Sequence, residues 1–360
     1  MKDMSRILTV LLLACVFLAP AHSRSLSEEA CNPLASKPNS SVKGDERQVS
    51  FDNPDTIFVA RDGTGQFRNV SEAVEVCRAF MEYHKVIFVK RGIYKEKLVI
   101  PSWLTNIEIC GEDALTTFIT YDDHANLTMG GFQDTTPNAQ HPKIGTFRTY
   151  TLKVEGSDIT LKNITIENNA AKLGQAVALH TEGDRLRFIG CRFLGNQDTV
   201  FTGVGGTTLS FEDCYIEGTT DFIFGPATAW FERCTIHSKA NSYITAASTP
   251  ADQPVGYIFH RCRLTADDGI DRVYLGRPWR PYAYTLFIAC DMGKHILPAG
   301  WDNWRNPDNE RTARYMEYGN YGEGANTAQR VAWSRQLSKK EADSLLSSSP
   351  WGDKRGAAVR

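Results

Sequence analysis

The sequence carries little net charge and lacks an apolar run long enough to cross a membrane. The formal net charge is -2 over 360 residues, so no overall field would draw the protein to nucleic acid or to an anionic membrane. The apolar run at residues 7–19 is shorter than the ~20 residues that a spanning helix needs. We therefore expect neither a nucleic-acid partner nor a membrane span.

The N-terminus instead resembles an export signal. Lys2 and Arg6 precede the apolar run, and Ala21-His22-Ser23 fits a signal-peptidase site. We therefore predict a signal peptide at residues 1–23, a flexible lead-in at 24–54, and an exported protein, whether secreted, periplasmic or in a cell wall. Lipid anchoring through Cys15 is the alternative for this segment.

The cysteines lack metal-ligand spacing, and most of them belong to a repeat. Cys31, Cys77 and Cys110 show no zinc-site pattern. The other mature cysteines each follow a phenylalanine by three residues and precede an apolar residue by two: Phe188/Cys191/Phe193, Phe211/Cys214/Ile216, Phe231/Cys234/Ile236, Phe259/Cys262/Leu264 and Phe287/Cys290/Met292. The cysteines are 23, 20, 28 and 28 residues apart, which indicates a stacked solenoid. Residues 162–166 resemble an earlier unit with Asn163 in the place of the cysteine.

Short β-rich runs separated by turns continue on both sides of this repeat and predict an all-β fold. The period is too short for propeller blades of about 40 residues and lacks the leucines of leucine-rich repeats, so we favour a parallel β-helix over a β-sandwich. Residues 67–83 have helical spacing and would cap the open end. Long C-terminal loops from Ala299, and a short helix after Ser338, would complete one domain over residues 55–360.

Two aspartates occupy the same phase of adjacent repeats. Asp198 lies seven residues after Cys191, and Asp221 lies seven residues after Cys214. Because neighbouring strands are ~4.8 Å apart, the two carboxyl groups should face each other. One pKa would then rise while the other stays low, which provides an acid and a nucleophile at one pH. The alternative is a pair of turn aspartates that bond their own backbone.

Four further residues have side chains that could stabilise an oxyanion, hold a carboxylate or contact a sugar ring. Gln175 and Gln197 could donate amide hydrogen bonds to an oxyanion. Arg277 could hold one carboxylate ionised, and Trp279 offers a flat face for a sugar ring. Any one of them could equally be a structural residue, so the prediction depends on their convergence.

The motifs that contain these residues resemble the pectin methylesterases, also called pectinesterases. The resemblance runs from about Ile57 to the region of Trp333 and includes DGTGQF (62–67), GIYKE (92–96), GQAVAL (174–179), QDT (197–199), DFIFG (221–225) and LGRPW (275–279). It implies a right-handed parallel β-helix that removes C6 methyl esters from homogalacturonan (pectin), without a metal or organic cofactor, and releases methanol. We expect a monomer.

The resemblance also assigns roles to particular residues. It implies Asp221 as nucleophile, Asp198 as general acid and then base, and Gln175 with Gln197 as the oxyanion hole. It further implies Arg277, Trp279 and Thr151 as substrate-binding residues, and a disulfide between Cys214 and Cys234. His180 stands where many relatives carry an arginine, which leaves the preferred methylation pattern open.

Three other functions compete with the esterase. An inverting polygalacturonan hydrolase would need carboxyl groups about 6.5–9.5 Å apart, which stacking on adjacent repeats disfavours. A lyase would need acidic residues clustered for calcium, and the sequence shows no such cluster. A non-catalytic solenoid could grip sugar with Trp279, Trp301 and Trp304, but it would not need two carboxylates.

Overall fold

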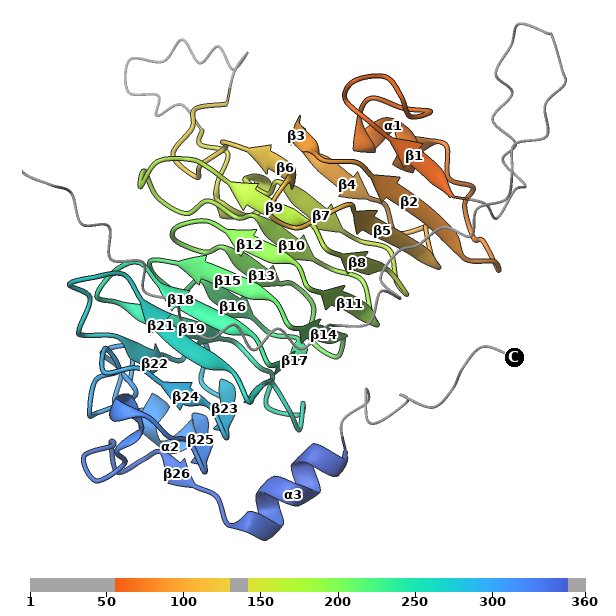
Figure 1. Cartoon of the computed structure of the whole chain (residues 1–360). Helices are drawn as coiled ribbons and strands as arrows, with labels where there is room; N and C mark the ends of the chain where they lie inside the picture. The colour runs from red at the N-terminus through yellow and green to blue at the C-terminus, as the bar shows by residue number, and fades with distance from the viewer. Residues whose placement is uncertain (1–55, 130–141, 349–360) are drawn as a thin grey trace, which may run out of the picture. The chain divides into compact units, whose positions relative to one another are not determined.

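A computed structural model describes residues 56–129 and 142–348. The chain winds in coils that stack on one another, and the strands of successive coils form three parallel sheets (Figure 1). The chain passes from one sheet to the next in each coil, and each strand pairs in parallel with its counterpart in the neighbouring coil. The all-β parallel β-helix is thereby confirmed. The signal peptide at 1–23, the lead-in at 24–54 and Cys15 lie outside the described residues.

The strands of each sheet follow one another along the stack. The first sheet contains β1 (Ile57–Val59), β2 (Lys85–Val89), β5 (Ile107–Gly111), β8 (Thr160–Lys162), β11 (Leu186–Ile189), β14 (Thr208–Glu212), β17 (Thr228–Glu232), β20 (Tyr257–His260), β23 (Tyr284–Ile288), β25 (Arg314–Tyr318) and β26 (Arg335–Gln336). The second sheet contains β4 (Leu98–Ile100), β7 (Leu152–Val154), β10 (Leu179–Thr181), β13 (Val200–Thr202), β16 (Ile223–Gly225), β19 (Tyr243–Ala247) and β22 (Tyr274–Gly276). The third sheet contains β3 (Gly92–Lys95), β6 (Thr117–Tyr121), β9 (Thr165–Asn168), β12 (Arg192–Leu194), β15 (Tyr215–Gly218), β18 (Thr235–Ser238), β21 (Arg263–Ala266) and β24 (Asp291–Met292).

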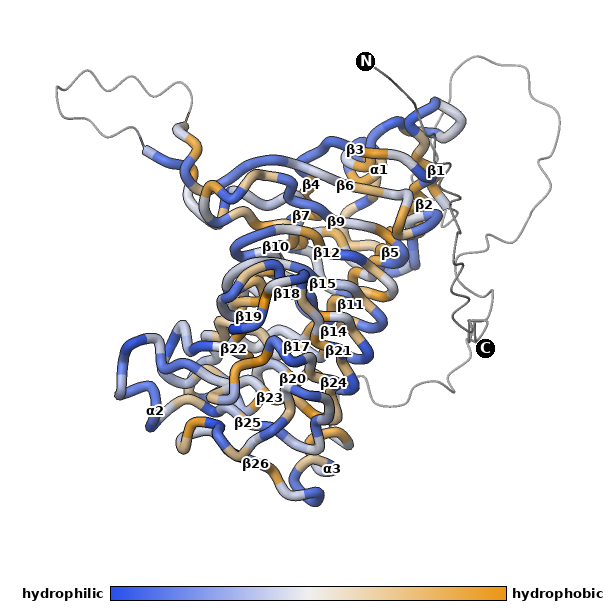
Figure 2. Tube along the Cα trace, turned by 60° about the vertical axis from the view of Figure 1, so that its left-hand side comes forward, coloured by the Kyte–Doolittle hydropathy of each residue, from blue (hydrophilic) through white to orange (hydrophobic). Residues whose placement is uncertain are grey.

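The phenylalanines of the repeat form one continuous stack inside the first sheet. Phe188, Phe211, Phe231, Phe259 and Phe287 are fully buried and pair in register. Successive ring centroids are 4.4–4.7 Å apart and the rings are nearly parallel. Apolar stretches recur from strand to strand along the coils (Figure 2). The repeat is therefore a ladder of identical core positions, because each coil buries its apolar side only against its neighbours.

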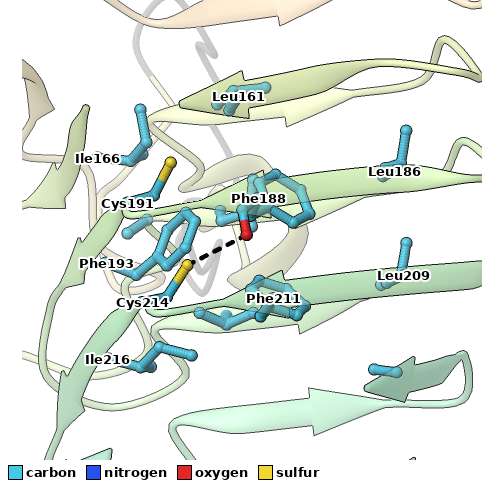
Figure 3. Packing of buried hydrophobic residues seen from close by; sticks show 14 of the residues in the cluster. Leu161, Ile166, Leu186, Phe188, Cys191, Phe193, Leu209, Phe211, Cys214 and Ile216 are labelled. Carbon is cyan, nitrogen blue, oxygen red and sulfur yellow. Dashed lines mark hydrogen bonds between the residues drawn. The ribbon is translucent and has the colours of Figure 1, made fainter. Parts of the chain in front are cut away.

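The cysteines form a second internal ladder, and the expected disulfide is wrong. Cys214 and Cys234 are free thiols. Cys214 Sγ donates to the carbonyl oxygen of Phe188 at 3.3 Å, as Figure 3 shows, and Cys234 Sγ donates to that of Phe211 at 3.3 Å. Each thiol is thus directed at a backbone carbonyl of the preceding coil. Burial raises the pKa of both thiols, which keeps them protonated donors.

The placement of Asn163 in the repeat also needs correction. Leu161 pairs with Phe188, so Ile164 holds the cysteine position and Asn163 lies opposite Gly190. Asn163 and Gly190 both have left-handed backbone, with φ of 49° and 61°. Asparagine tolerates this conformation better than most residues, so the turn, rather than the core, accounts for Asn163.

The predicted N-terminal helix is shorter than its periodicity indicates. The helix α1 (Val70–Glu75) buries Val70, Ala73 and Val74, and Asn69 with Glu72 forms a capping box at its start. The chain then leaves the helix, and Phe80 adopts a left-handed φ of 55°. The expectation of a 67–83 helix is therefore wrong in length, and the capping of the stack by this segment stays a prediction.

The C-terminal region adds strands where we expected only loops. The strands β25 and β26 extend the first sheet, and Trp301 and Tyr315 lie in the core with ring centroids 4.2 Å apart. The region also contains the short helix α2 (Asn309–Thr312). The predicted capping box at Ser338 opens α3 (Lys339–Ser347). Short 3₁₀ turns occur at Thr146–Arg148 and Glu323–Ala325.

Candidate active site

The two aspartates lie side by side at the entrance to adjacent strands of the second sheet. Val200 of β13 pairs with Ile223 of β16, so Asp198 and Asp221 occupy the same position two residues earlier, and their predicted equal phase is confirmed. The Asp198 amide donates to the Thr220 carbonyl at 3.1 Å, and the Asp221 amide donates to the Tyr243 carbonyl at 2.8 Å. The backbone of the coils therefore fixes both residues.

Burial and one arginine set the charges of this pair. Asp198 and Asp221 are 8% and 6% exposed. Arg277 Nε donates to Asp221 Oδ1 at 2.9 Å, and Arg277 Nη2 donates to Asp221 Oδ2 at 2.6 Å. Burial and the neighbouring Asp221 charge raise the pKa of Asp198 well above its ordinary value. Burial also raises the pKa of Asp221, but the Arg277 hydrogen bonds oppose that rise, so Asp221 ionises first and Asp198 retains a proton.

Two aromatic rings hold the guanidinium of Arg277. Its central carbon lies 3.9 Å from the ring centroid of Tyr243 and 3.7 Å from that of Trp304. A guanidinium stacks well on aromatic faces. Contact with both rings therefore fixes the orientation of the guanidinium plane, in which the two N–H groups that donate to Asp221 lie. Sequence reasoning missed both roles, since Tyr243 and Trp304 show no motif that links them to Arg277.

Gln197 lies three residues before β13, and Gln175 lies four residues before β10, the strand that pairs with β13. The Gln197 carbonyl accepts from the Ala176 amide at 3.0 Å, and the Gln175 carbonyl accepts from the Ala125 amide at 2.8 Å. Both side chains are partly exposed. Among the described residues neither side-chain amide is engaged in a hydrogen bond, so both are available as donors beside the aspartates.

A line of rings runs from the aspartates toward the N-terminal coils. We call Phe147, His180, Phe201, Phe224 and Trp279 the aromatic row. His180 pairs with Phe201 and Phe201 with Phe224 on successive strands, and ring centroids are 4.8 Å apart for His180 and Phe201, 4.8 Å for Phe201 and Phe224, and 5.8 Å for Phe224 and Trp279. Phe201 and Phe224 were missed as site residues, although each follows its aspartate by three residues in the same coil.

The family model described as Pectinesterase matches residues 56–349. The chain belongs to the pectinesterase family.

Individual pectinesterases agree with this membership in sequence and in fold. Pectinesterase 31 from Arabidopsis thaliana is 38% identical over 296 residues, which are 79% of this chain and 89% of that protein. The solved pectin methylesterase from carrot has a TM-score of 0.72 at 31% identity, over 81% of this chain and 91% of that one. A pectin methylesterase solved in complex with a hexasaccharide has a TM-score of 0.70 at 27% identity, over 82% and 97%.

Two expected sugar contacts are not on the surface of this pectinesterase. Thr151 is fully buried, and its hydroxyl donates to the Glu167 carbonyl at 2.8 Å. Its assignment as a substrate contact is therefore wrong in this conformation. Trp301 is 1% exposed and packs within the core, so it cannot grip a sugar as the binding-module alternative requires. Trp279 is partly exposed and packs against Phe224, which leaves part of its surface accessible.

The ion pair that the structure shows in the site joins Arg277 and Asp221. Across residues 56–129 and 142–348, no group of three or more His, Cys, Asp or Glu side chains is arranged to hold a metal ion. In the same part of the chain, no helix is both long and apolar enough to cross a membrane. The site contains the carboxyl groups of Asp198 and Asp221, the Gln175 and Gln197 amides, the Arg277 guanidinium and the ring of Trp279.

Proposed function

We propose that this pectinesterase hydrolyses C6 methyl esters of homogalacturonan, with Asp221 as nucleophile and Asp198 as proton donor and acceptor. The observation that carries the proposal is the bidentate contact of Arg277 with one member of a buried aspartate pair. It favours the ionised form of Asp221 while the neighbouring Asp198 stays protonated, as nucleophile and acid must be at the start of the reaction.

In the first step, a carboxylate oxygen of Asp221 attacks the C6 carbonyl carbon of the ester. The amides of Gln175 and Gln197 donate to the oxyanion that develops. Asp198 transfers its proton to the methoxy oxygen as the C–O bond breaks, and methanol departs. The product is an acyl-enzyme, a mixed anhydride between galacturonate and Asp221.

In the second step, ionised Asp198 removes a proton from a water molecule, whose oxygen attacks the acyl carbon. The bond to Asp221 breaks, and Asp221 regains its charge beside Arg277. The sugar leaves as a free carboxylic acid that loses its proton to solvent. Asp198 is protonated again, so the enzyme returns to its initial state.

Backbone hydrolysis fits the register less well than ester hydrolysis. Asp198 and Asp221 lie on directly paired strands, and such strands are ~4.8 Å apart. Inversion at a glycosidic carbon requires room for a water between carboxyl groups about 6.5–9.5 Å apart. A binding module would gain nothing from a buried carboxyl group that is kept protonated, because its burial is costly.

The test compares wild type with Asp221→Asn on methyl-esterified pectin, with methanol and new reducing ends measured in parallel. We expect methanol release to fall by about 10⁴-fold or more, with no new reducing ends from either protein. Asp213→Asn is a matched control, because Asp213 has the same left-handed backbone and accepts from Arg233 at 2.8 and 2.9 Å at an outer turn. Equal methanol from wild type and Asp221→Asn, or chain cleavage without methanol, would refute the proposal.

We further propose that the protein is exported and acts as a monomer. The proposal of export rests on the basic and apolar pattern of residues 1–23. N-terminal sequencing of the mature protein checks it: cleavage after Ser23 supports soluble export, whereas a lipid-modified Cys15 would indicate anchoring. Sedimentation of the mature protein at several concentrations checks the monomer.

A further inference from the structure

A cluster of charged side chains borders the aromatic row at the end distant from Arg277. We call Lys153, Glu155, His180 and Glu182 the His180 cluster. Lys153 Nζ lies 2.8 Å from Glu155 Oε1 and 3.1 Å from Glu182 Oε1, and His180 Nε2 lies 3.0 Å from the same Glu182 oxygen. The proposed ester hydrolysis uses none of these groups. Their contacts fix the Glu182 carboxylate beside a ring that belongs to the row.

The cluster has one more negative than positive charge. Lys153 carries a positive charge, and Glu155 and Glu182 each carry a negative charge. Burial lowers the pKa of His180, so its ring is neutral at neutral pH. His180 itself is 3% exposed, but the side chains of Glu155 and Glu182 are 28% and 39% exposed. The excess negative charge therefore reaches the surface through the two glutamates.

The opposite end of the row has the reverse charge. Arg280 is exposed, and its guanidinium carbon lies 5.1 Å from the ring centroid of Trp279. Among the described residues Arg280 has no carboxylate partner. A polymer lying along the row therefore meets the Arg280 cation beside Trp279 and a cluster with one excess negative charge beside His180.

The register gives the separation between the cluster and the reacting ester along the stack. His180, Phe201 and Phe224 are paired neighbours on three successive strands, and Phe224 is in the same coil as Asp221. Two coils span about 10 Å, a length comparable to two pyranose units of an extended polysaccharide. The Glu182 carboxylate is thus placed beside a sugar unit other than the one being hydrolysed.

The charge of a galacturonate unit depends on whether its C6 carboxyl group is methyl-esterified. A methyl-esterified unit is neutral, and a free galacturonate unit is an anion. An anionic unit beside Glu182 would be repelled by the net charge of the cluster, whereas a neutral unit would not. We propose that Glu182, held by Lys153 and His180, is a specificity-determining residue that selects a methyl-esterified unit about two sugars from the reacting ester. This inference rests on the proposed ester hydrolysis and adds the preferred pattern of its substrate.

The test uses methyl-esterified hexagalacturonides, either fully esterified or with one free carboxylate at a defined position. The readout is kcat/KM for methanol release. For wild type we expect the free carboxylate to lower kcat/KM about two- to fivefold, the effect of one partly exposed charge pair, and only at a position about two units to one side of the reacting ester. This penalty should shrink at high salt.

Glu182→Gln should abolish the penalty and leave kcat/KM for the fully esterified oligomer unchanged, which also shows that the variant folds. Glu217→Gln is the matched control: Glu217 accepts from Lys239 at 2.8 Å on the third sheet, and its loss should leave the penalty intact. A wild type without any positional penalty, or a penalty that persists in Glu182→Gln, would overturn the inference alone. Absence of methanol from every oligomer would overturn the proposed function and the inference with it.

Discussion

Replacement of Arg277 by lysine tests the central electrostatic argument. Arg277 makes two charge-assisted hydrogen bonds to Asp221 in a buried setting. Such bonds contribute about 1.5–3 kcal/mol each, and the single ammonium of lysine can replace one of them. The ionised form of Asp221 should then lose about 1.5–3 kcal/mol of stabilisation, which corresponds to roughly one to two pKa units.

The direction of the resulting pH shift follows from the roles of the two carboxyl groups. Asp221 must be ionised in the free enzyme, so the acid limb of kcat/KM reports its apparent pKa. Arg277 opposes the burial that raises this pKa, and therefore Arg277→Lys should move the acid limb to higher pH by about one to two units. At pH values below the shifted limb, kcat/KM of Arg277→Lys should be about 10- to 100-fold lower than that of wild type at the same pH.

The assay is methanol release from methyl-esterified pectin, followed from acidic to alkaline pH. Arg233→Lys is the matched control, because Arg233 makes the same two-pronged contact with Asp213 at a half-exposed outer turn. Its pH profile should match that of wild type. An acid limb that stays in place in Arg277→Lys, or that moves equally in both variants, would refute the assignment of Arg277 as the group that keeps Asp221 ionised.

Two further predictions concern stability and the buried thiols. Asp198→Asn should remove the activity yet melt at a higher temperature than wild type at neutral pH. Folding raises the pKa of Asp198, so wild type loses stability as the pH rises above about 4, the pKa of an aspartate in the unfolded chain. The gain in melting temperature should therefore vanish below that pH. The repeat cysteines, each at most 1% exposed, should react with a polar thiol reagent only after unfolding. A Cys214–Cys234 cross-link in non-reducing peptide maps would contradict the thiol prediction.

The phase of the repeat was predictable because a parallel coil leaves little freedom of register. Once Phe188 stacks on Phe211, a slip of one residue would turn every buried side chain outward. Equal spacing after Cys191 and Cys214 therefore carries over to Asp198 and Asp221. The same physics does not fix a thiol rotamer, so the sequence could not show that Cys214 donates to a carbonyl.

Contacts between loops and coils could not be predicted in this way. Arg277 reaches Asp221 across 56 positions of sequence, and Trp304 reaches Arg277 from a loop outside the repeat. The predicted length of α1 was wrong for another reason. Apolar spacing marks which side of a segment is buried, and an irregular segment can bury Cys77 and Met81 as well as a helix does.

The backbone at the two aspartates connects the architecture to the chemistry. Asp198 and Asp221 have left-handed φ of 67° and 50°, a conformation that costs most non-glycine residues about 1–3 kcal/mol. The coils accept the same conformation at another corner, for example at Asp213 and Arg233, with φ of 53° each. Left-handed corners are thus a recurrent requirement of this stack, and aspartate is among the side chains that tolerate them best. The strain at the candidate active site therefore belongs to the coil itself, which holds both carboxyl groups in place before a substrate arrives.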